Sequence, residues 1–147
     1  MEAPVSNSGQ FNYLQTIPDV LQTMASVHDL IDAHGLEKPL QHLVLLRASQ
    51  INRCAYCVKM HTDEARRDGE TSERLDRVIV WEDVDDFSDR EKTALAWTEA
   101  LTTINGKAER ANLRDRLRSH FSDEEVGALT ATIAMINLWN RIQVSDH

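Results

Sequence analysis

Apolar side chains recur at intervals of three or four residues along most of this 147-residue chain. This interval places them on one face of an α-helix, whereas a half-buried β-strand shows strict alternation. Proline removes a backbone donor, so the first apolar region is expected to divide at Pro18. The pattern predicts helices at about 11–34, 39–51, 54–67, 72–81, 88–105, 108–119 and from 122 onward.

Residues that cap or end helices stand at several of these boundaries. The runs Ser88 to Glu91 and Ser122 to Glu125 match a capping box, in which each side chain of the pair bonds the other residue's backbone N–H. Gly106 is expected to close helix 88–105. Between helices 72–81 and 88–105, the acidic residues 82–86 are expected to form a loop.

The chain contains only five glycines and three prolines. This scarcity of turn residues favours long helices over a β-sandwich with many turns. A chain of this length is sufficient for one compact domain with a real core. We therefore predict an all-α fold, a single domain of about seven helices over residues 11–147, preceded by a flexible N-terminus at residues 1–10.

The last predicted helix is apolar nearly all round. A helix of this kind is buried at the centre of a domain or at a subunit interface. Trp139 and its neighbours Asn140 and Arg141 lie on this helix, and we interpret the tryptophan as packing. The apolar residues are Val126, Leu129, Ala131, Ile133, Ala134, Met135, Ile136 and Leu138.

The formal net charge is −8. This charge argues against nucleic acid or an anionic membrane surface as a partner. No stretch reaches the roughly 18 apolar residues of a membrane span, and the N-terminus lacks the basic start and apolar centre of a secretory signal. We expect a cytoplasmic protein, where two cysteines are normally thiols rather than a structural disulfide.

The only two cysteines stand in the sequence CAYCVKMH, residues 54–61. If a helix begins near Cys54, its unpaired N–H groups and positive dipole favour a thiolate there. Cys57 lies one turn further on, and His61 lies four residues beyond Cys57 on the same side. Two thiols and a base with a pKa near neutrality are what a dithiol redox cycle requires.

Other interpretations of this segment remain open. The cysteines could be small core residues, since free cysteine is frequently buried. A zinc site would need a third and a fourth ligand; His61 could supply one, but the usual second pair of ligands is absent. No βαβ pattern indicates a thioredoxin fold. The sequence has no glycine-rich phosphate loop and no sign of a nucleotide, haem or flavin cofactor.

The run ASQINRCAYCVKMHTDEARRDGETSERLDRV, residues 48–78, resembles the core of the carboxymuconolactone decarboxylase-like superfamily, in its alkylhydroperoxidase D-like branch. Residues 128–142 resemble the end of that domain. The resemblance implies an all-α fold, trimers or hexamers, and thiol-dependent reduction of peroxides or disulfides. It also implies that Cys54 and Cys57 are the redox cysteines and that His61 is the motif histidine.

Two positions depart from the family pattern. The family's relay glutamate, twelve residues before the first cysteine, is His42 in this chain, and the glycine before that cysteine is Arg53. We hypothesise that His42 substitutes for the acid; the alternative is that it merely faces core or solvent. The positive charge of Arg53 beside Cys54 should favour the thiolate.

These features together predict an antioxidant enzyme that reduces hydroperoxides through a dithiol/disulfide cycle, with Cys54, Cys57, His61 and His42 as its catalytic residues. Its partners would be a hydroperoxide, an external dithiol or protein reductant, and further copies of the chain. Which cysteine attacks stays open, because helix position favours Cys54 and proximity to His61 favours Cys57. The alternatives are a protein disulfide reductase and a non-enzymatic redox-sensing oligomer.

Overall fold

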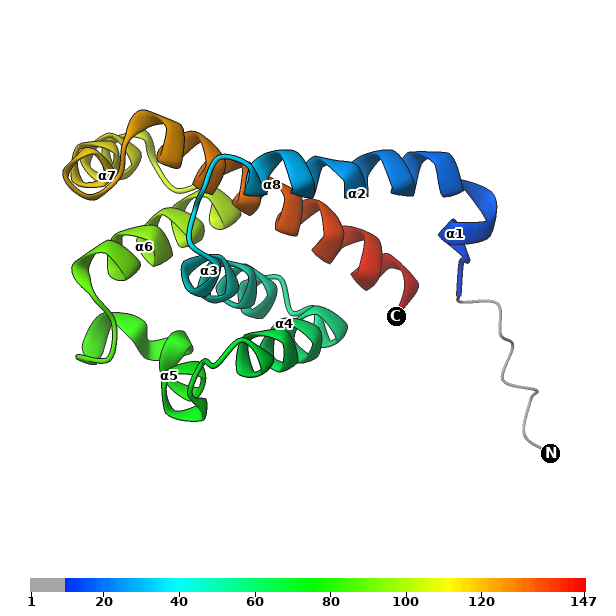
Figure 1. Cartoon of the computed structure of the whole chain (residues 1–147), viewed down its shortest axis with the longest axis horizontal. Coiled ribbons are helices and arrows are strands. Elements are labelled where there is room, and N and C mark those ends of the chain that lie inside the picture. Colours follow the sequence, from blue (N-terminus) through cyan, green and yellow to red (C-terminus); the bar gives the residue numbers. More distant parts are fainter. Residues whose placement is uncertain (1–9) are drawn as a thin grey trace.

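The computed structural model describes residues 10–147, and no strand occurs among them, which confirms the all-α prediction (Figure 1). The described residues form one α-helix more than the predicted seven, because the first region divides before Pro18 as expected, with Ile17 between the two helices. The predicted flexible segment, residues 1–10, lies outside the described residues except for Gln10. The helices are α1 (Tyr13–Thr16), α2 (Pro18–Asp32), α3 (Lys38–Ile51), α4 (Ala55–Arg67), α5 (Ser72–Arg77), the 3-10 helix η1 (Val78–Asp83), α6 (Asp89–Thr103), α7 (Lys107–His120) and α8 (Asp123–Asp146).

Helix α3 lies at the centre of the molecule and packs against α4, α6 and α8. Two of its faces belong to two different hydrophobic clusters. Leu40 and Val44 pack in a cluster with residues of α6, α7 and α8. Leu43 and Leu46 pack in a second cluster with residues of α4, α5, η1 and α6. Helix α4, which follows the Cys54 turn, is therefore seated on the most buried helix of the fold.

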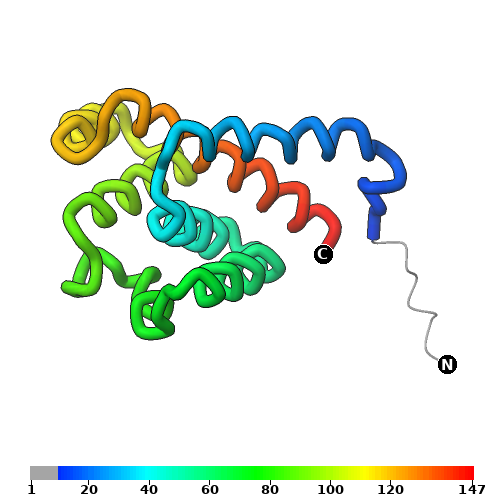
Figure 2. Tube along the Cα trace, viewed as in Figure 1, coloured from blue at the N-terminus to red at the C-terminus, as the bar shows by residue number. Residues whose placement is uncertain are grey.

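Helix α8 is the apolar C-terminal helix, and it contacts α2, α3, α4 and α6. Leu129, Ile133 and Ile136 on this helix are buried, so the prediction of central burial is confirmed. Its C-terminal end lies beside α1, as the chain trace shows (Figure 2). There the hydroxyl groups of Tyr13 and Ser145 are 2.7 Å apart. The two ends of the described chain thus form one end of the molecule.

Both predicted capping boxes are present, at the start of α6 and at the start of α8. Two other boundaries differ from the prediction. The helix predicted over 72–81 ends as an α-helix at Arg77 and continues as the 3-10 helix η1, because Val80 has non-helical dihedral angles; η1 takes in the first residues of the predicted acidic loop. Gly106 does not close α6: Ile104, at φ 55°, ends that helix, and Gly106 caps the start of α7.

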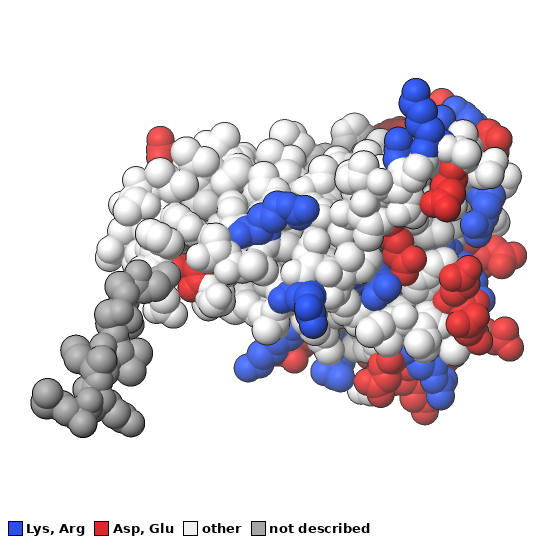
Figure 3. Space-filling view, turned by 180° about the vertical axis from the view of Figure 1, so that it is seen from behind, with Lys and Arg blue, Asp and Glu red and all other residues white. Residues whose placement is uncertain are grey.

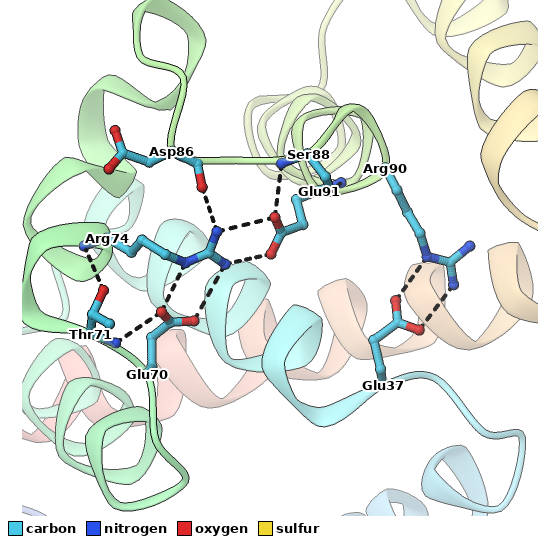
Figure 4. A network of polar contacts seen from close by, with 8 residues as sticks. All are labelled: Glu37, Glu70, Thr71, Arg74, Asp86, Ser88, Arg90 and Glu91. Atoms are coloured by element: carbon cyan, nitrogen blue, oxygen red, sulfur yellow. Dashed lines mark hydrogen bonds and ion pairs between the residues drawn. The ribbon is translucent and has the colours of Figure 1, made fainter.

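A network of charged side chains joins α5 to α6 (Figure 4). The Arg74 guanidinium donates hydrogen bonds to the carboxylates of Glu70 and Glu91 and to the backbone carbonyl of Asp86. Glu91 also accepts the backbone N–H of Ser88, which starts α6. The α5–α6 junction is therefore held by polar groups that all have partners.

Charged side chains are unevenly distributed over the surface. Lys, Arg, Asp and Glu crowd the end of the molecule that holds α5, α6 and α7, whereas the opposite end is largely uncharged (Figure 3). That uncharged end includes the exposed apolar residues Phe11, Leu14, Ile17 and Val20 of the α1–α2 region. Within residues 10–147, every helix is too short or too polar to cross a membrane.

Candidate active site

A tight turn between α3 and α4 presents Cys54. Arg53 in this turn has φ 56°, the left-handed conformation that glycine adopts most readily. Helix α4 begins at Ala55, one residue later than predicted, so Cys54 is its N-cap. The Cys54 Sγ accepts the backbone N–H of Cys57 at 3.3 Å, and the two cysteines form a disulfide with a Cα–Cα distance of 5.3 Å. The structure therefore holds the pair in its oxidised form.

A buried amide network fixes this turn to α8. Asn52 Nδ2 lies 2.9 Å from the Oδ1 atoms of both Asn137 and Asn140. Asn140, which is fully buried, donates from its own Nδ2 to the Ser49 hydroxyl on α3. The apolar pattern of this helix predicts packing for Trp139 and gives no indication of the network. An asparagine within an otherwise apolar helix was the available signal, since a buried amide needs hydrogen-bond partners.

A cavity of about 320 Å³ opens beside the disulfide, between α2, α3, α4 and α8. Cys57 and His61 both line it, which agrees with their predicted placement on one side of a helix. Cys54 does not line it and is 2 % exposed, against 1 % for Cys57. The cavity therefore approaches the pair from the Cys57 side. Its apolar lining comprises Leu45, Tyr56, Met60, Ile136 and Trp139.

His61 is buried without hydrogen-bond partners. Its Nδ1 lies 3.4 Å from Glu64 Oε2, and neither ring nitrogen makes a hydrogen bond within the described part of the chain. Burial lowers the pKa of His61, and the nearby Glu64 carboxylate opposes this only in part. The neutral imidazole, which is the form that can accept a proton, is therefore favoured at neutral pH.

His42 lies on α3 and is buried, so the alternative that it faces solvent is wrong. Its Nε2 is 2.6 Å from the Oδ2 of Asp68, at the end of α4, and its Nδ1 makes no hydrogen bond among residues 10–147. The positive charge of a protonated His42, like that of a protonated His28, would lower the pKa of His61. His42 does not line the cavity itself.

Two further side chains of this region were not singled out from the sequence. Asp68 directly follows the predicted helix 54–67 and was not among the candidate residues. His28, on α2, accepts a hydrogen bond from Trp139 Nε1 at 2.7 Å, and both residues line the cavity. Neither contact is visible in the spacing of residues along a single helix.

The site offers dithiol and acid–base chemistry from its own side chains. In residues 10–147, no group of three or more His, Cys, Asp or Glu side chains is arranged to hold a metal ion. The disulfide joins the two sulfurs, and the cavity brings Cys57 and His61 together; the His42–Asp68 pair lies outside the cavity lining.

Comparison with known proteins identifies the fold and its family. Residues 18–100 match the model of the carboxymuconolactone decarboxylase family. The chain belongs to this family. It is 33 % identical over 138 residues, 94 % of each chain, to the uncharacterized protein YdfG of Bacillus subtilis (strain 168).

Two solved structures of relatives share the fold. The protein ATU0492 of Agrobacterium tumefaciens, of unknown function and proposed to be the antioxidant defence protein AhpD, superimposes with a TM-score of 0.88; it is 36 % identical, with 94 % of each chain covered. The debrominase Bmp8 superimposes with a TM-score of 0.75 at 21 % identity, over 87 % of this chain and 69 % of Bmp8. At that identity, the likeness to Bmp8 concerns the fold alone.

Proposed function

We propose that this member of the carboxymuconolactone decarboxylase family is a peroxidase that reduces organic hydroperoxides through the Cys54–Cys57 pair. The observation that carries the proposal is that Cys57 and His61 line one cavity beside a disulfide-forming cysteine pair. The likeness to ATU0492, proposed to be an antioxidant defence protein, supports the same activity.

Cys57 is the attacking cysteine in this proposal, because it lines the cavity and Cys54 does not. The neutral His61 ring takes the proton of the Cys57 thiol. The thiolate attacks the terminal oxygen of the hydroperoxide, the O–O bond breaks, and the alkoxide takes the proton from His61 and leaves as an alcohol. Cys57 is then oxidised to a sulfenic acid.

Cys54 resolves this intermediate. Its sulfur attacks the Cys57 sulfur, the S–O bond breaks, and the departing hydroxide takes the Cys54 proton and leaves as water. The disulfide seen in the structure is the product of this step. An external dithiol, the reductant that the cycle requires, supplies two electrons and restores both thiols.

The shape of the cavity supports an organic hydroperoxide rather than a protein disulfide as substrate. Both sulfurs are buried, so a partner protein could not approach them without rearrangement of α2 or α8. The cavity next to Cys57 is large enough for a small organic group, and its wall is mostly apolar. Tyr56, Trp139 and Gln143 also line a larger hollow of about 750 Å³, which extends toward α1.

Turnover of cumene hydroperoxide with dithiothreitol as the reductant tests this function. We expect the wild-type protein to consume the peroxide and Cys57→Ser to be inactive. Cys54→Ser should perform a single turnover and leave a Cys57 sulfenic acid that dimedone traps. A Cys57→Ser variant as active as the wild type, with circular dichroism showing both folded, would refute the proposal.

We also propose that the chain assembles with copies of itself in the cytoplasm. The uncharged end of the molecule carries the exposed residues Phe11, Leu14, Ile17 and Val20, and apolar surface of this kind is typical of subunit contacts. Light scattering on the purified protein should give the mass of a trimer or hexamer, and Leu14→Asp should reduce it. A wild-type mass equal to one chain would exclude the assembly.

A further inference from the structure

Asp68 occupies a position that helix electrostatics do not explain. It is the C-cap of α4, where the helix dipole is negative and a carboxylate is unfavourable. Its side chain is 56 % exposed and accepts no hydrogen bond from the helix end. The partner that its carboxylate does have is the buried His42 ring, 2.6 Å away across the α3–α4 contact.

This contact determines which His42 nitrogen carries the proton. An ionised carboxylate can only accept a hydrogen bond, so the Nε2 atom of His42 must donate. In the neutral ring Nδ1 then has a free lone pair. That atom is buried and lacks a hydrogen-bond partner in the part of the chain that the structure describes. The Asp68 contact thus turns a proton-accepting atom inward.

We propose that Asp68 is a positioning residue of the site, holding His42 as an inward-facing proton acceptor that serves His61. This inference rests on the proposed peroxidase function and adds to it Asp68, a residue that acts through His42. Within residues 10–147, both His61 ring nitrogens are likewise buried without a hydrogen bond. In this proposal a proton passes between the His61 and His42 rings, directly or through a water molecule.

The step moves one proton and no electrons. His61 takes the proton from Cys57 and passes it to His42 Nδ1, and the Asp68 carboxylate stabilises the resulting imidazolium through its bond to Nε2. The proton returns by the same route to the alkoxide that leaves the hydroperoxide. The Glu64 carboxylate on α4 lies 3.4 Å from His61 Nδ1 and balances the charge of the protonated ring.

Two measurements test this role. Asp68→Ala should lower kcat for cumene hydroperoxide about tenfold, the usual effect of removing the group that orients a functional histidine. KM should stay within about twofold, because Asp68 does not line the cavity. In ¹⁵N spectra of the imidazoles, neutral His42 should be protonated at Nε2 in the wild type and should lose this preference in Asp68→Ala.

Asp63→Ala is the matched control, since it removes the same charge from an exposed position of the same helix. Asp68→Asn keeps an oxygen acceptor without the charge, so it should retain the Nε2–H form and fall between wild type and Asp68→Ala in kcat. The inference is refuted if kcat of Asp68→Ala equals that of Asp63→Ala, or if the His42 tautomer does not change. A wild type without peroxidase activity would refute the proposed function, and the imidazole spectra would still decide whether Asp68 holds His42.

Discussion

The polar groups of the α5–α6 junction and those beside the disulfide differ in how fully they are hydrogen-bonded. At the junction, Arg74 bonds two carboxylates and a carbonyl. In the cysteine region, neither nitrogen of the buried His61 makes a hydrogen bond among residues 10–147, and His42 makes one on a single nitrogen. The α5–α6 junction is partly exposed to solvent, whereas the two histidines are more deeply buried and make fewer hydrogen bonds.

Leaving a buried polar atom without a hydrogen bond costs about 1–3 kcal/mol, so such atoms are rare in folded proteins. The Arg74 network shows that this chain can satisfy buried charge where stability requires it. In the described part of the chain, the buried side-chain nitrogen and oxygen atoms without a hydrogen bond all belong to His42 and His61. This difference indicates that the junction serves stability and that the histidine region retains binding capacity for a proton or a substrate.

The largest expected effect comes from His61→Leu. Removal of the proton acceptor should lower kcat/KM for cumene hydroperoxide by about 100-fold or more. The free energy of unfolding should stay level or increase, because the unpartnered nitrogens are replaced by an apolar group. Steady-state kinetics measure the expected loss of kcat/KM, and urea unfolding measures the free energy of unfolding. His34→Leu is the control, since His34 is exposed and pairs with Glu124; it should leave the kinetics unchanged.

Arg74→Met should have the converse effect. It leaves Glu70 and Glu91 without their shared cation and should lower the free energy of unfolding by about 2 kcal/mol. Catalysis by the folded protein should be unaffected. Arg118→Met is the control, because Arg118 forms an exposed pair with Asp115 that should contribute less than about 1 kcal/mol. Equal losses in the two variants, measured by urea unfolding, would contradict the comparison.

The two regions should also respond to acid in different pH ranges. Burial would raise the pKa of Glu91, but the Arg74 and Ser88 hydrogen bonds outweigh it and hold this pKa below 4.5. The stability that Glu91 contributes is therefore present above pH 4.5 and lost below it. Burial lowers the pKa of His61 below 6.5, so the unfolded chain binds its proton first, and stability is lost as the pH falls below 6.5.

Urea unfolding at a series of pH values separates these contributions. His61→Leu should remove the part of the decrease that begins near pH 6.5 and leave the decrease below pH 4.5. Glu91→Gln should weaken the decrease in stability below pH 4.5 and leave the decrease that begins near pH 6.5. An unchanged profile for His61→Leu between pH 7 and pH 5 would show that His61 is protonated equally in the folded and unfolded chain.

The smallest effect is expected for Arg53→Gly. Glycine relieves the left-handed backbone at φ 56° but adds freedom to the unfolded chain, so the net gain should be roughly 0.5 kcal/mol. Ile104→Gly is a matched control, because Ile104 has φ 55° and lies away from the cysteines; it should gain a similar amount. Only Arg53→Gly should lower the thiolate fraction of the reduced protein, followed by the ultraviolet absorbance of the thiolate across a pH series, since it removes the positive charge beside Cys54. Equal thiolate titrations of the wild type and Arg53→Gly would leave Arg53 without influence on the thiol.

The sequence predicted those parts of the fold and site that depend on spacing within one helix. The capping boxes at Ser88 and Ser122 and the alignment of Cys57 with His61 follow from the helical repeat. The helix end at Ile104 was missed, because a left-handed isoleucine has no sequence signal, whereas Gly106 nearby suggested a false one.

Contacts between helices were beyond such reasoning. His42 and Asp68 are 26 residues apart, and Asn52 and Asn140 are 88 residues apart. Their meeting depends on how α3 packs against α4 and α8. His42 could be proposed from a family resemblance, but its carboxylate partner required the packed structure. The same holds for the cavity, which four separate helices enclose.

The Cys54 sulfur makes a second interaction besides its bond to Cys57. It accepts a hydrogen bond from the Cys57 backbone amide and so caps the start of α4. A change in the electron density on that sulfur therefore changes the strength of its hydrogen bond to the Cys57 amide. Each round of oxidation and reduction would alter the first turn of the helix that bears His61, so the amide of Cys57 is a natural reporter of the redox state of the protein.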